Sequence, residues 1–480
     1  MMNSRRYAKG VRIPLAILLA SLLPSVLADR GKPLVKAPLP RSEIKASDSL
    51  TQAPARPEVN LVQLLAEPQR CSEWAGLQTD GPVQIADALA AAICRSVGVR
   101  QGAGLALQAQ SALDRARAQR QPALSLAAGL DSVRGSGTDA TASLRLDWVL
   151  FDFGGQQASM QSARAGLAAA LDDQRAEVLA AVADTAVLYT ATQAALGRKD
   201  VANANLRTAQ DSARIAEARQ KAGASTLVDK LQAQTALAQA RLDLSRATSQ
   251  WLSASGALAV AMGLSAGQSI DVARINAEAE ALLDQSVDLP QLIDEARSRH
   301  PRVQAARARL EEAEARAAGL RTGRWGNVAL NASSGRSRAS SDSAVRGSTT
   351  AGLTWNVPLF DRGVLDSQLR DAQGQILVRG IGVDDAMRQV ELQVWQQGRA
   401  LLSERDGLRE NKAVIDSAEH VLRVATERFR LGVGNLSDVL TAQNVAASAR
   451  FQWDEAHSNV LRARLRLAAA VGRLGPLSNP

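Results

Sequence analysis

A segment of twelve residues that occurs twice, 209 positions apart, is the feature that most constrains this chain. The copies are GASTLVDKLQAQ, at 223–234, and GVGNLSDVLTAQ, at 432–443. The same offset aligns the pattern Phe-Asp-x-Gly at 151–154 with a second copy at 360–363. This period is far too long for a solenoid of short repeats, so we expect one large supersecondary unit used twice.

Each unit contains two segments in which apolar and polar residues alternate, the period of a strand. The first hairpin is expected from strands at 123–133 and 142–150, with a turn at 135–139. The second is expected from strands at 327–333 and 351–359, with a Ser/Arg-rich loop to about 347. Strands of about 10 to 13 residues suit a tilted membrane strand.

Four strands cannot close a barrel by themselves. Open strand edges in lipid leave backbone groups unsatisfied, so strands of other subunits must complete the sheet. The alternative is a soluble hairpin that packs on the helices of its own chain.

Helical periodicity surrounds each hairpin. A helix is expected from Gln84 to about Arg120, ended by Pro122, and very long helices from Gln156 to about Ala222 and from Val364 to about Leu431. At 1.5 Å per residue either long helix reaches roughly 100 Å, which indicates a coiled-coil-like or tubular assembly. After the glycine turns, return helices run to about Met262 and Val471. Three glycines in the second long helix (Gly374, Gly380 and Gly382) predict a bend or a domain joint.

The first 28 residues read as a secretory signal, with a basic start, an apolar run and a small-residue cleavage site at Val26-Leu27-Ala28. Asp29 would follow the cut, so no lipid-acceptor cysteine is placed there. Beyond the signal there is no continuous run of 18 apolar residues, so we expect no membrane-spanning helix.

The two cysteines, Cys71 and Cys94, predict a disulfide, since the chain is exported to an oxidising compartment. Two buried free thiols are the alternative. These features give the following domains: signal peptide 1–28, Pro-rich periplasmic lead-in 29–83, repeat one 84–264, linker 265–289, repeat two 290–473 and C-terminal tail 474–480.

The net charge of +9 does not indicate nucleic-acid binding, because basic residues alternate with Asp and Glu along helices. The three histidines (His300, His420 and His457) have no metal-ligand spacing, and we find no nucleophile motif or phosphate-binding glycine loop. We therefore expect no enzyme activity, no catalytic residues, no metal and no cofactor.

The duplicated Phe-Asp-x-Gly and the duplicated Gly-x-x-x-Leu-x-Asp-x-Leu-x-Ala-Gln resemble the TolC family of outer-membrane export channels over about residues 84–473. The resemblance implies a homotrimer in which three chains supply a 12-stranded outer-membrane β-barrel, four strands per chain, in contact with outer-membrane lipid. The barrel would continue into a long periplasmic α-helical barrel built from both tandem repeats. It also implies a periplasmic adaptor protein and an inner-membrane ABC transporter as partners, and an exported substrate.

In such a trimer the helix turns form the inner tip. Asp438, and equivalently Asp229, would then line a pore ring that attracts cations. The alternative is that each Asp only sits in the first turn of its return helix, where the macrodipole favours it. The expected adaptor-docking residues at the tips are Gly223, Ala224, Leu227, Gly432, Gly434 and Leu436.

In the best-studied channel of the family, a Tyr, an Arg and a second Asp also hold the entrance closed. Their positions correspond here to Phe429, Gly434 and Thr441. These side chains cannot form the same polar links, so we expect an entrance that is looser or held by packing.

Within the family, the missing lipid-acceptor cysteine and the cysteine pair near the first helix look like the type I protein-secretion branch. Its substrate would be an exported protein such as an RTX haemolysin or adenylate cyclase toxin. Small-molecule or multidrug efflux is the alternative, and a non-conducting coiled-coil envelope scaffold is the alternative from another class.

Overall fold

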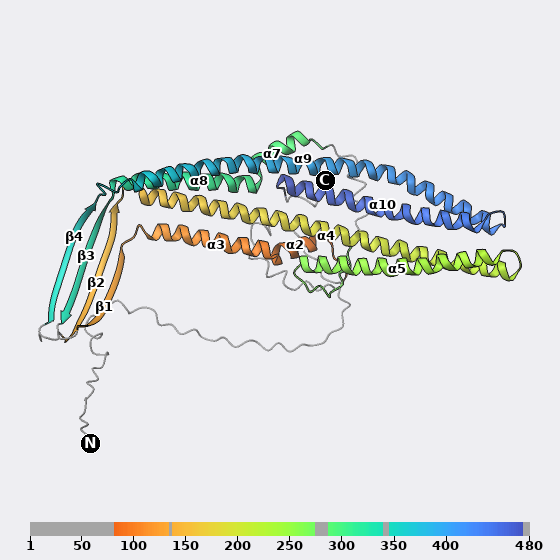
Figure 1. The fold of residues 1–480 in the computed structure, drawn as a ribbon, viewed down its shortest axis with the longest axis horizontal. Helices are drawn as coiled ribbons and strands as arrows, with labels where there is room; N and C mark the ends of the chain where they lie inside the picture. Colours follow the sequence, from red (N-terminus) through yellow and green to blue (C-terminus); the bar gives the residue numbers. More distant parts are fainter. Residues whose placement is uncertain (1–80, 134–136, 274–286, 339–344, 474–480) are drawn as a thin grey trace, which may run out of the picture. The chain divides into compact units, whose positions relative to one another are not determined.

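The computed structural model describes residues 81–133, 137–273, 287–338 and 345–473, which form long helices and one four-stranded sheet (Figure 1). By internal contacts the chain divides after Pro57, and all described residues belong to the second unit, Glu58–Pro480. The signal, most of the lead-in and the tail lie outside the described residues. Cys71 does too, so its bond to Cys94 stays a prediction.

Two copies of the same element order make up the described chain. The first copy is α2 (Ile85–Arg95), α3 (Val97–Ala118), β1 (Ala123–Val133), β2 (Gly137–Phe151), α4 (Gly155–Lys221) and α5 (Leu227–Ala261). The second is α7 (Leu289–Arg299), α8 (Pro301–Thr322), the short η2 (Gly323–Trp325), β3 (Asn327–Arg338), β4 (Val345–Asn356), α9 (Val364–Arg430) and α10 (Leu436–Val471). Elements before the hairpins recur at 204 positions (85 and 289, 97 and 301), and those after them at 209 (155 and 364, 227 and 436). The second hairpin region is thus five residues longer, and the 209-residue offset found in the sequence covers only the later part of the repeat.

The single helix expected from Gln84 to Arg120 is wrong, because α2 ends at Arg95 and α3 begins at Val97. Ser96 between them has ψ 134°, an extended conformation that interrupts the helix. The second repeat breaks at the equivalent place, where His300 has ψ 132° and precedes Pro301. A residue before proline disfavours the helical conformation, which explains the second break directly.

The two long helices match their expected extents, at 67 residues each. The expected interruption of α9 is wrong: the helix is continuous through Gly374, Gly380 and Gly382, and a side chain at any of the three would meet open space. One 18-residue window of α4 is apolar enough to cross a membrane by composition, but half of it is buried within the protein. Its contacts with α3, α5, α8 and α10 account for that apolar character.

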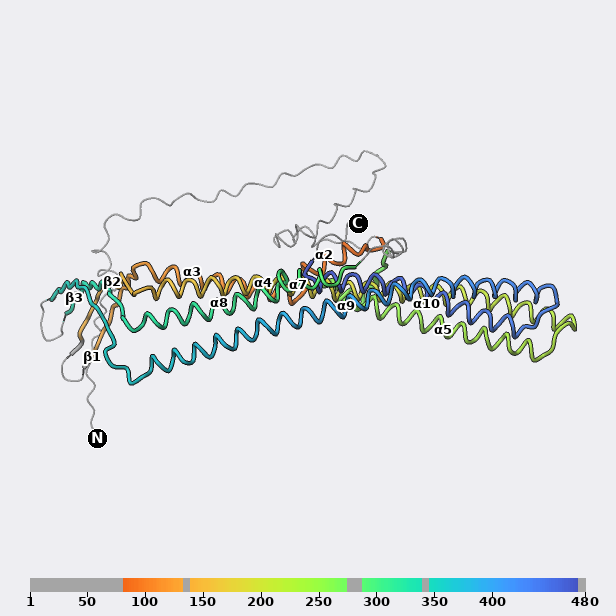
Figure 2. The backbone as a smooth tube through the Cα atoms, turned by 90° about the horizontal axis from the view of Figure 1, so that it is seen from above, coloured from red at the N-terminus to blue at the C-terminus, as the bar shows by residue number. Residues whose placement is uncertain are grey.

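The helices are arranged as two hairpins, α4 with α5 and α9 with α10, whose turns lie at the end of the molecule opposite the strands (Figures 1 and 2). α10 also packs on α4, and α8 packs between α4 and α9. The core between them consists mostly of alanine with Val and Leu at intervals, such as Ala186, Val390 and Val460, all fully buried. Small side chains permit this close side-by-side approach, as in coiled-coil packing.

The sheet has the order β1-β2-β3-β4, with all neighbours antiparallel. The second hairpin is longer than expected: β3 runs to Arg338 and β4 begins at Val345, within the segment predicted as loop. Hydroxyl pairs hold these polar halves together, since Ser333 Oγ lies 2.8 Å from Thr350 Oγ1 and Ser334 Oγ lies 3.0 Å from Thr349 Oγ1. β4 ends at Asn356, so Val357 and Leu359 are not strand residues.

Two buried polar side chains fix the middle of the molecule. Tyr189 on α4 is fully buried, with its hydroxyl oxygen 2.9 Å from Val83 O and 3.1 Å from Ala273 O. It thereby ties the segment before α2 and the segment after α5, which also meet in a parallel bridge between Val83 and Val272. His300 is 4% exposed, and its Nδ1 accepts a 3.1 Å hydrogen bond from Arg302 N, capping α8. Burial lowers the pKa of His300 to about 4, and the nearby Arg302 charge acts in the same direction.

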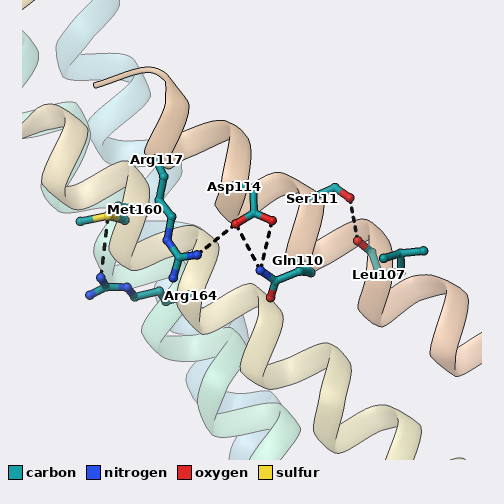
Figure 3. Close-up of polar contacts among 7 residues, drawn as sticks. All are labelled: Leu107, Gln110, Ser111, Asp114, Arg117, Met160 and Arg164. Atoms are coloured by element: carbon teal, nitrogen blue, oxygen red, sulfur yellow. Dashed lines mark hydrogen bonds and ion pairs between the residues drawn. The ribbon is translucent and has the colours of Figure 1, made fainter. Parts of the chain in front are cut away.

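Surface polar contacts mostly join neighbouring turns of one helix. Figure 3 shows Asp114 of α3 accepting hydrogen bonds from Gln110 Nε2 at 3.2 Å and from Arg117 Nη1 at 3.0 Å. The Ser111 hydroxyl donates to Leu107 O in the same helix at 2.9 Å. Such pairs contribute only about 0.2–0.5 kcal/mol each, so the packing between helices depends on their buried apolar faces.

Candidate functional site

The two helix turns at the tip explain why the duplicated segment begins with glycine. Gly223 has φ 71° and Gly432 has φ 80°, in the left-handed region that residues with a Cβ rarely adopt. Each turn is closed by a backbone bond that reaches back five residues, from Ala224 N to Arg219 O (2.8 Å) and from Val433 N to Arg428 O (3.0 Å). This is the Schellman termination of a helix, and it reverses the chain into the return helix.

Asp229 closes a capping box at the start of α5. Its backbone N–H donates to Thr226 Oγ1 at 3.2 Å, and its carboxylate accepts from Thr226 N at 2.9 Å. The backbone N–H and the hydroxyl of Thr226 together lower the pKa of Asp229. In this arrangement Asp229 satisfies orphan backbone groups of the helix end, the structural role considered beside the pore-ring role.

Asp438 holds the equivalent position in α10 without that cap. The N-cap residue of α10 is Asn435, which makes no side-chain capping bond, and Asp438 is exposed. Its carboxylate is therefore available to solvent or to a neighbouring chain. Thr441, one turn further along the same helix, is also exposed.

The expected adaptor-docking residues are not equivalent in the two repeats. Gly223, Ala224 and Gly432 are exposed, and Leu227 is 60% exposed. Leu436, its counterpart, is only 3% exposed and packs in a cluster with Phe429 and Val439. Gly434 is confined by its own chain, because a Cβ there would lie 3.0 Å from the Phe429 nitrogen.

Two polar links join the repeats near the tip, so packing alone does not hold them. Arg219 of α4 donates from Nη1 to Phe429 O in α9 at 2.9 Å, and its guanidinium carbon lies 4.7 Å from the centre of the Phe429 ring. One turn or two away, buried Gln443 of α10 donates to the buried Ser212 hydroxyl of α4 at 2.8 Å. We call these four residues the tip clasp. Sequence reasoning missed both links, since the partners lie more than 200 residues apart.

A second arginine of α4 repeats the arrangement higher in the helices. The Arg198 guanidinium lies 4.2 Å from the centre of the Phe451 ring and bonds the Glu455 carboxylate at 3.1 Å, both on α10. Phe429 and Phe451 are the only phenylalanines in helices. Both are thus covered by arginines of the first repeat, and cation–π contacts of this kind favour one orientation of the two helical hairpins.

The duplicated Phe-Asp-x-Gly forms the corner between strand and long helix. Asp361 accepts hydrogen bonds from Gly363 N at 3.0 Å and Leu365 N at 2.9 Å, and Asp152 accepts equivalently from Gly154 N and Gln156 N. The glycines have φ 78° and 102°. The motif therefore caps the first turn of α4 and α9. The backbone bond from Leu365 is the largest cause that lowers the pKa of Asp361.

The sheet at the other end has one apolar face. Leu124, Leu126 and Leu130 of β1 are 66–74% exposed, and Leu353 and Trp355 of β4 are 67% and 64% exposed. Strand register places these residues on one side, while polar and charged residues such as Asn331 and Asp147 occupy the other. In the described chain, β1 and β4 each have a partner on one side only. Across the described ranges no group of three or more His, Cys, Asp or Glu is placed to hold a metal ion.

Comparison with known proteins agrees with this arrangement. The family described as "Outer membrane efflux protein" matches residues 89–264 and 292–473. The chain is 29% identical to Protein CyaE of Bordetella pertussis over 407 residues, 81% of this chain and 84% of that protein. It is 22% identical to the toluene efflux pump outer membrane protein TtgF of Pseudomonas putida over 338 residues, 68% of each chain. The crystal structure of the outer membrane protein VceC from Vibrio cholerae has the same fold, with a TM-score of 0.67 at 20% identity over 81% of this chain and 96% of that one.

Proposed function

The chain belongs to the outer membrane efflux protein family, and we propose from this premise that it is the outer-membrane channel of a type I secretion system. In this role it passes a protein substrate, such as an RTX haemolysin or adenylate cyclase toxin, to the exterior. The substrate arrives from an inner-membrane ABC transporter and a periplasmic adaptor. The protein itself supplies a water-filled path and no energy.

The observation that carries the proposal is the four-stranded sheet with an apolar face and two open edges. In lipid, each unpaired backbone group costs several kcal/mol, so the edges β1 and β4 require partners. Three copies of the chain, each joining β4 to β1 of the next, give a closed barrel of 12 strands. The helical hairpins of the three copies continue below it as a tunnel.

The turns at the far end are the proposed adaptor-docking site. The exposed residues Gly223, Ala224, Leu227 and Gly432 support docking on both turns, whereas the burial of Leu436 moves the apolar contact toward the first repeat. At the same end, Asp438 from three chains forms the proposed cation-attracting ring. Asp229 contributes to this ring only if its carboxylate leaves the Thr226 cap.

Protein secretion is favoured over small-molecule efflux by two observations. The position after the predicted cleavage site is Asp29, not a lipid-acceptor cysteine. The chain also shares more identity with Protein CyaE (29%) than with the toluene efflux pump protein (22%).

Deletion of the gene separates these functions. The proposal expects a protein to disappear from the culture medium while susceptibility to drugs and solvents stays unchanged. It also expects the same loss when the cognate ABC transporter is removed. A secretome that does not change, together with raised susceptibility to small molecules, would assign the channel to efflux instead. No change in either would favour a non-conducting scaffold.

A further inference from the structure

Two arginines interrupt the apolar face of the sheet. Arg336 and Arg338 of β3 are exposed, and strand register places them on the same side as the leucines of β1. Arg336 lies between Ala142 of β2 and Gly347 of β4, and Arg338 lies between Ala140 and Val345. Their cross-strand neighbours are therefore small or apolar side chains that cannot pair with a guanidinium.

The face around these arginines has no carboxylate in the described parts of the strands. Asp131, Asp139 and Asp147 are the only acidic residues in these strands, and register places all three on the opposite face. Two positive charges thus stand side by side on a surface that supplies no counter-ion of its own. An unpaired charge on a lipid-facing surface is costly near the bilayer centre and is tolerated near its boundary.

Their height relative to the aromatic residues places them at such a boundary. Trp148 and Trp355 lie at the end of the sheet next to the helices, where their indole N–H groups donate to Arg120 O at 3.0 Å and Trp325 O at 3.3 Å. Aromatic residues of this kind mark the edge of the apolar band of a barrel. Ten positions of β4 separate Trp355 from Val345, which pairs with Arg338. At about 3.4 Å per residue and a tilt of about 40°, this is roughly 26 Å of height, close to the ~25 Å of the apolar band.

We propose that Arg336 and Arg338 bind the phosphate groups of lipids in the outer leaflet of the membrane. Guanidinium groups are suited to phosphate because they offer several N–H donors in a planar fork. The outer leaflet follows from the strand direction, since β3 ends at Arg338 at the end of the sheet away from the helices (Figure 1). The inference rests on the proposed trimeric barrel for its orientation.

Barrel closure leaves this site open to lipid. The neighbouring chain pairs with the edge strands β1 and β4, whereas β3 already has a partner on both sides. The outward side chains of β3 are therefore not covered by that contact. A trimer would carry three such sites around its rim.

The test measures lipid bound to the purified, detergent-solubilised trimer by native mass spectrometry, with bisphosphorylated lipid A as probe and dephosphorylated lipid A as its control. The double variant R336Q/R338Q should bind the phosphorylated lipid about tenfold less tightly, because each arginine near a charged surface contributes to the attraction. R346Q is the matched control, since it removes the same charge from the same end of the sheet on the opposite face. It should bind as the parent does.

Three results would overturn the proposal: unchanged binding in the double variant, an equal loss in R346Q, or binding that does not depend on the lipid phosphates. Inorganic phosphate that binds as tightly as the lipid would also contradict it, by identifying a free-anion site. If the double variant yields no trimer, R336Q and R338Q are measured singly, and each should show a smaller loss. Single-channel conductance of the same samples tests the channel separately, because a conducting trimer without lipid selectivity would refute only the lipid site.

Discussion

Arg219 of α4 holds Phe429 of α9 by two different interactions, a 2.9 Å hydrogen bond to its carbonyl oxygen and a guanidinium placed over its ring. The two residues belong to different repeats, so the contact joins the two helical hairpins at their tips. A cation–π contact is worth about 0.5–1 kcal/mol at an exposed site and more where it is desolvated. The tip clasp is therefore a constraint that opening of the entrance has to break.

We predict that R219Q raises the resting conductance of the channel in a planar bilayer. Glutamine loses both the positive charge over the ring and the geometry of the carbonyl bond. R214Q is the matched control on the same helix, since Arg214 pairs only with exposed Asp211 one turn away. An R219Q channel with parental conductance, or one no more conductive than R214Q, would show that the clasp does not hold the entrance.

Asp438 should control ion selectivity more than opening. We expect Asp438→Asn to lower cation selectivity and weaken block by multivalent cations, because three carboxylates near one axis attract them. The reversal potential in a salt gradient measures this. Asp229→Asn is the comparison: it disturbs the capping box, so it should lower thermal stability with a smaller change in selectivity. Unchanged selectivity with a widely open Asp438→Asn channel would make Asp438 a latch.

His300 should make the helix joint sensitive to acid. Its pKa in the folded protein is about 4, below the ordinary 6.5, so an unfolded chain binds the proton first as the pH falls. The contribution to stability is complete above pH 6.5 and is lost between pH 6.5 and 4, by at most about 1.4 kcal/mol per pH unit. Thermal melts across this range should show a slope that His300→Asn reduces and that His420→Asn, at an exposed position, does not. Equal slopes in parent and His300→Asn would exclude this role.

Much of the fold could be predicted from the sequence because its signals are local. The glycine turns, the long helices and the first hairpin follow from residues whose backbone conformation or periodicity is distinctive. The polar halves of β3 and β4 were missed because Ser, Thr and Arg do not alternate with apolar residues there, and their pairing depends on hydroxyl contacts across strands. The break at Ser96 has no proline of its own. The break at Pro301, carried back by 204 positions, would have indicated it.

The candidate site was less predictable, because it depends on contacts between repeats. The duplicated motif places Asp229 and Asp438 at equivalent positions, but only the structure distinguishes the capped carboxylate from the exposed one. Likewise, Leu227 and Leu436 are the same residue of the motif, and only packing against Phe429 buries the second. No local pattern identifies Arg219 as the partner of a residue 210 positions away.

The central claim is that several copies of this chain close a membrane pore, and single-channel recording of the purified full-length protein in a planar bilayer tests it most directly. We predict discrete, long-lived conductance steps of one size, because a barrel completed by three identical chains gives one defined pore. Folded protein that inserts into the bilayer and yet gives no conductance steps would contradict the account.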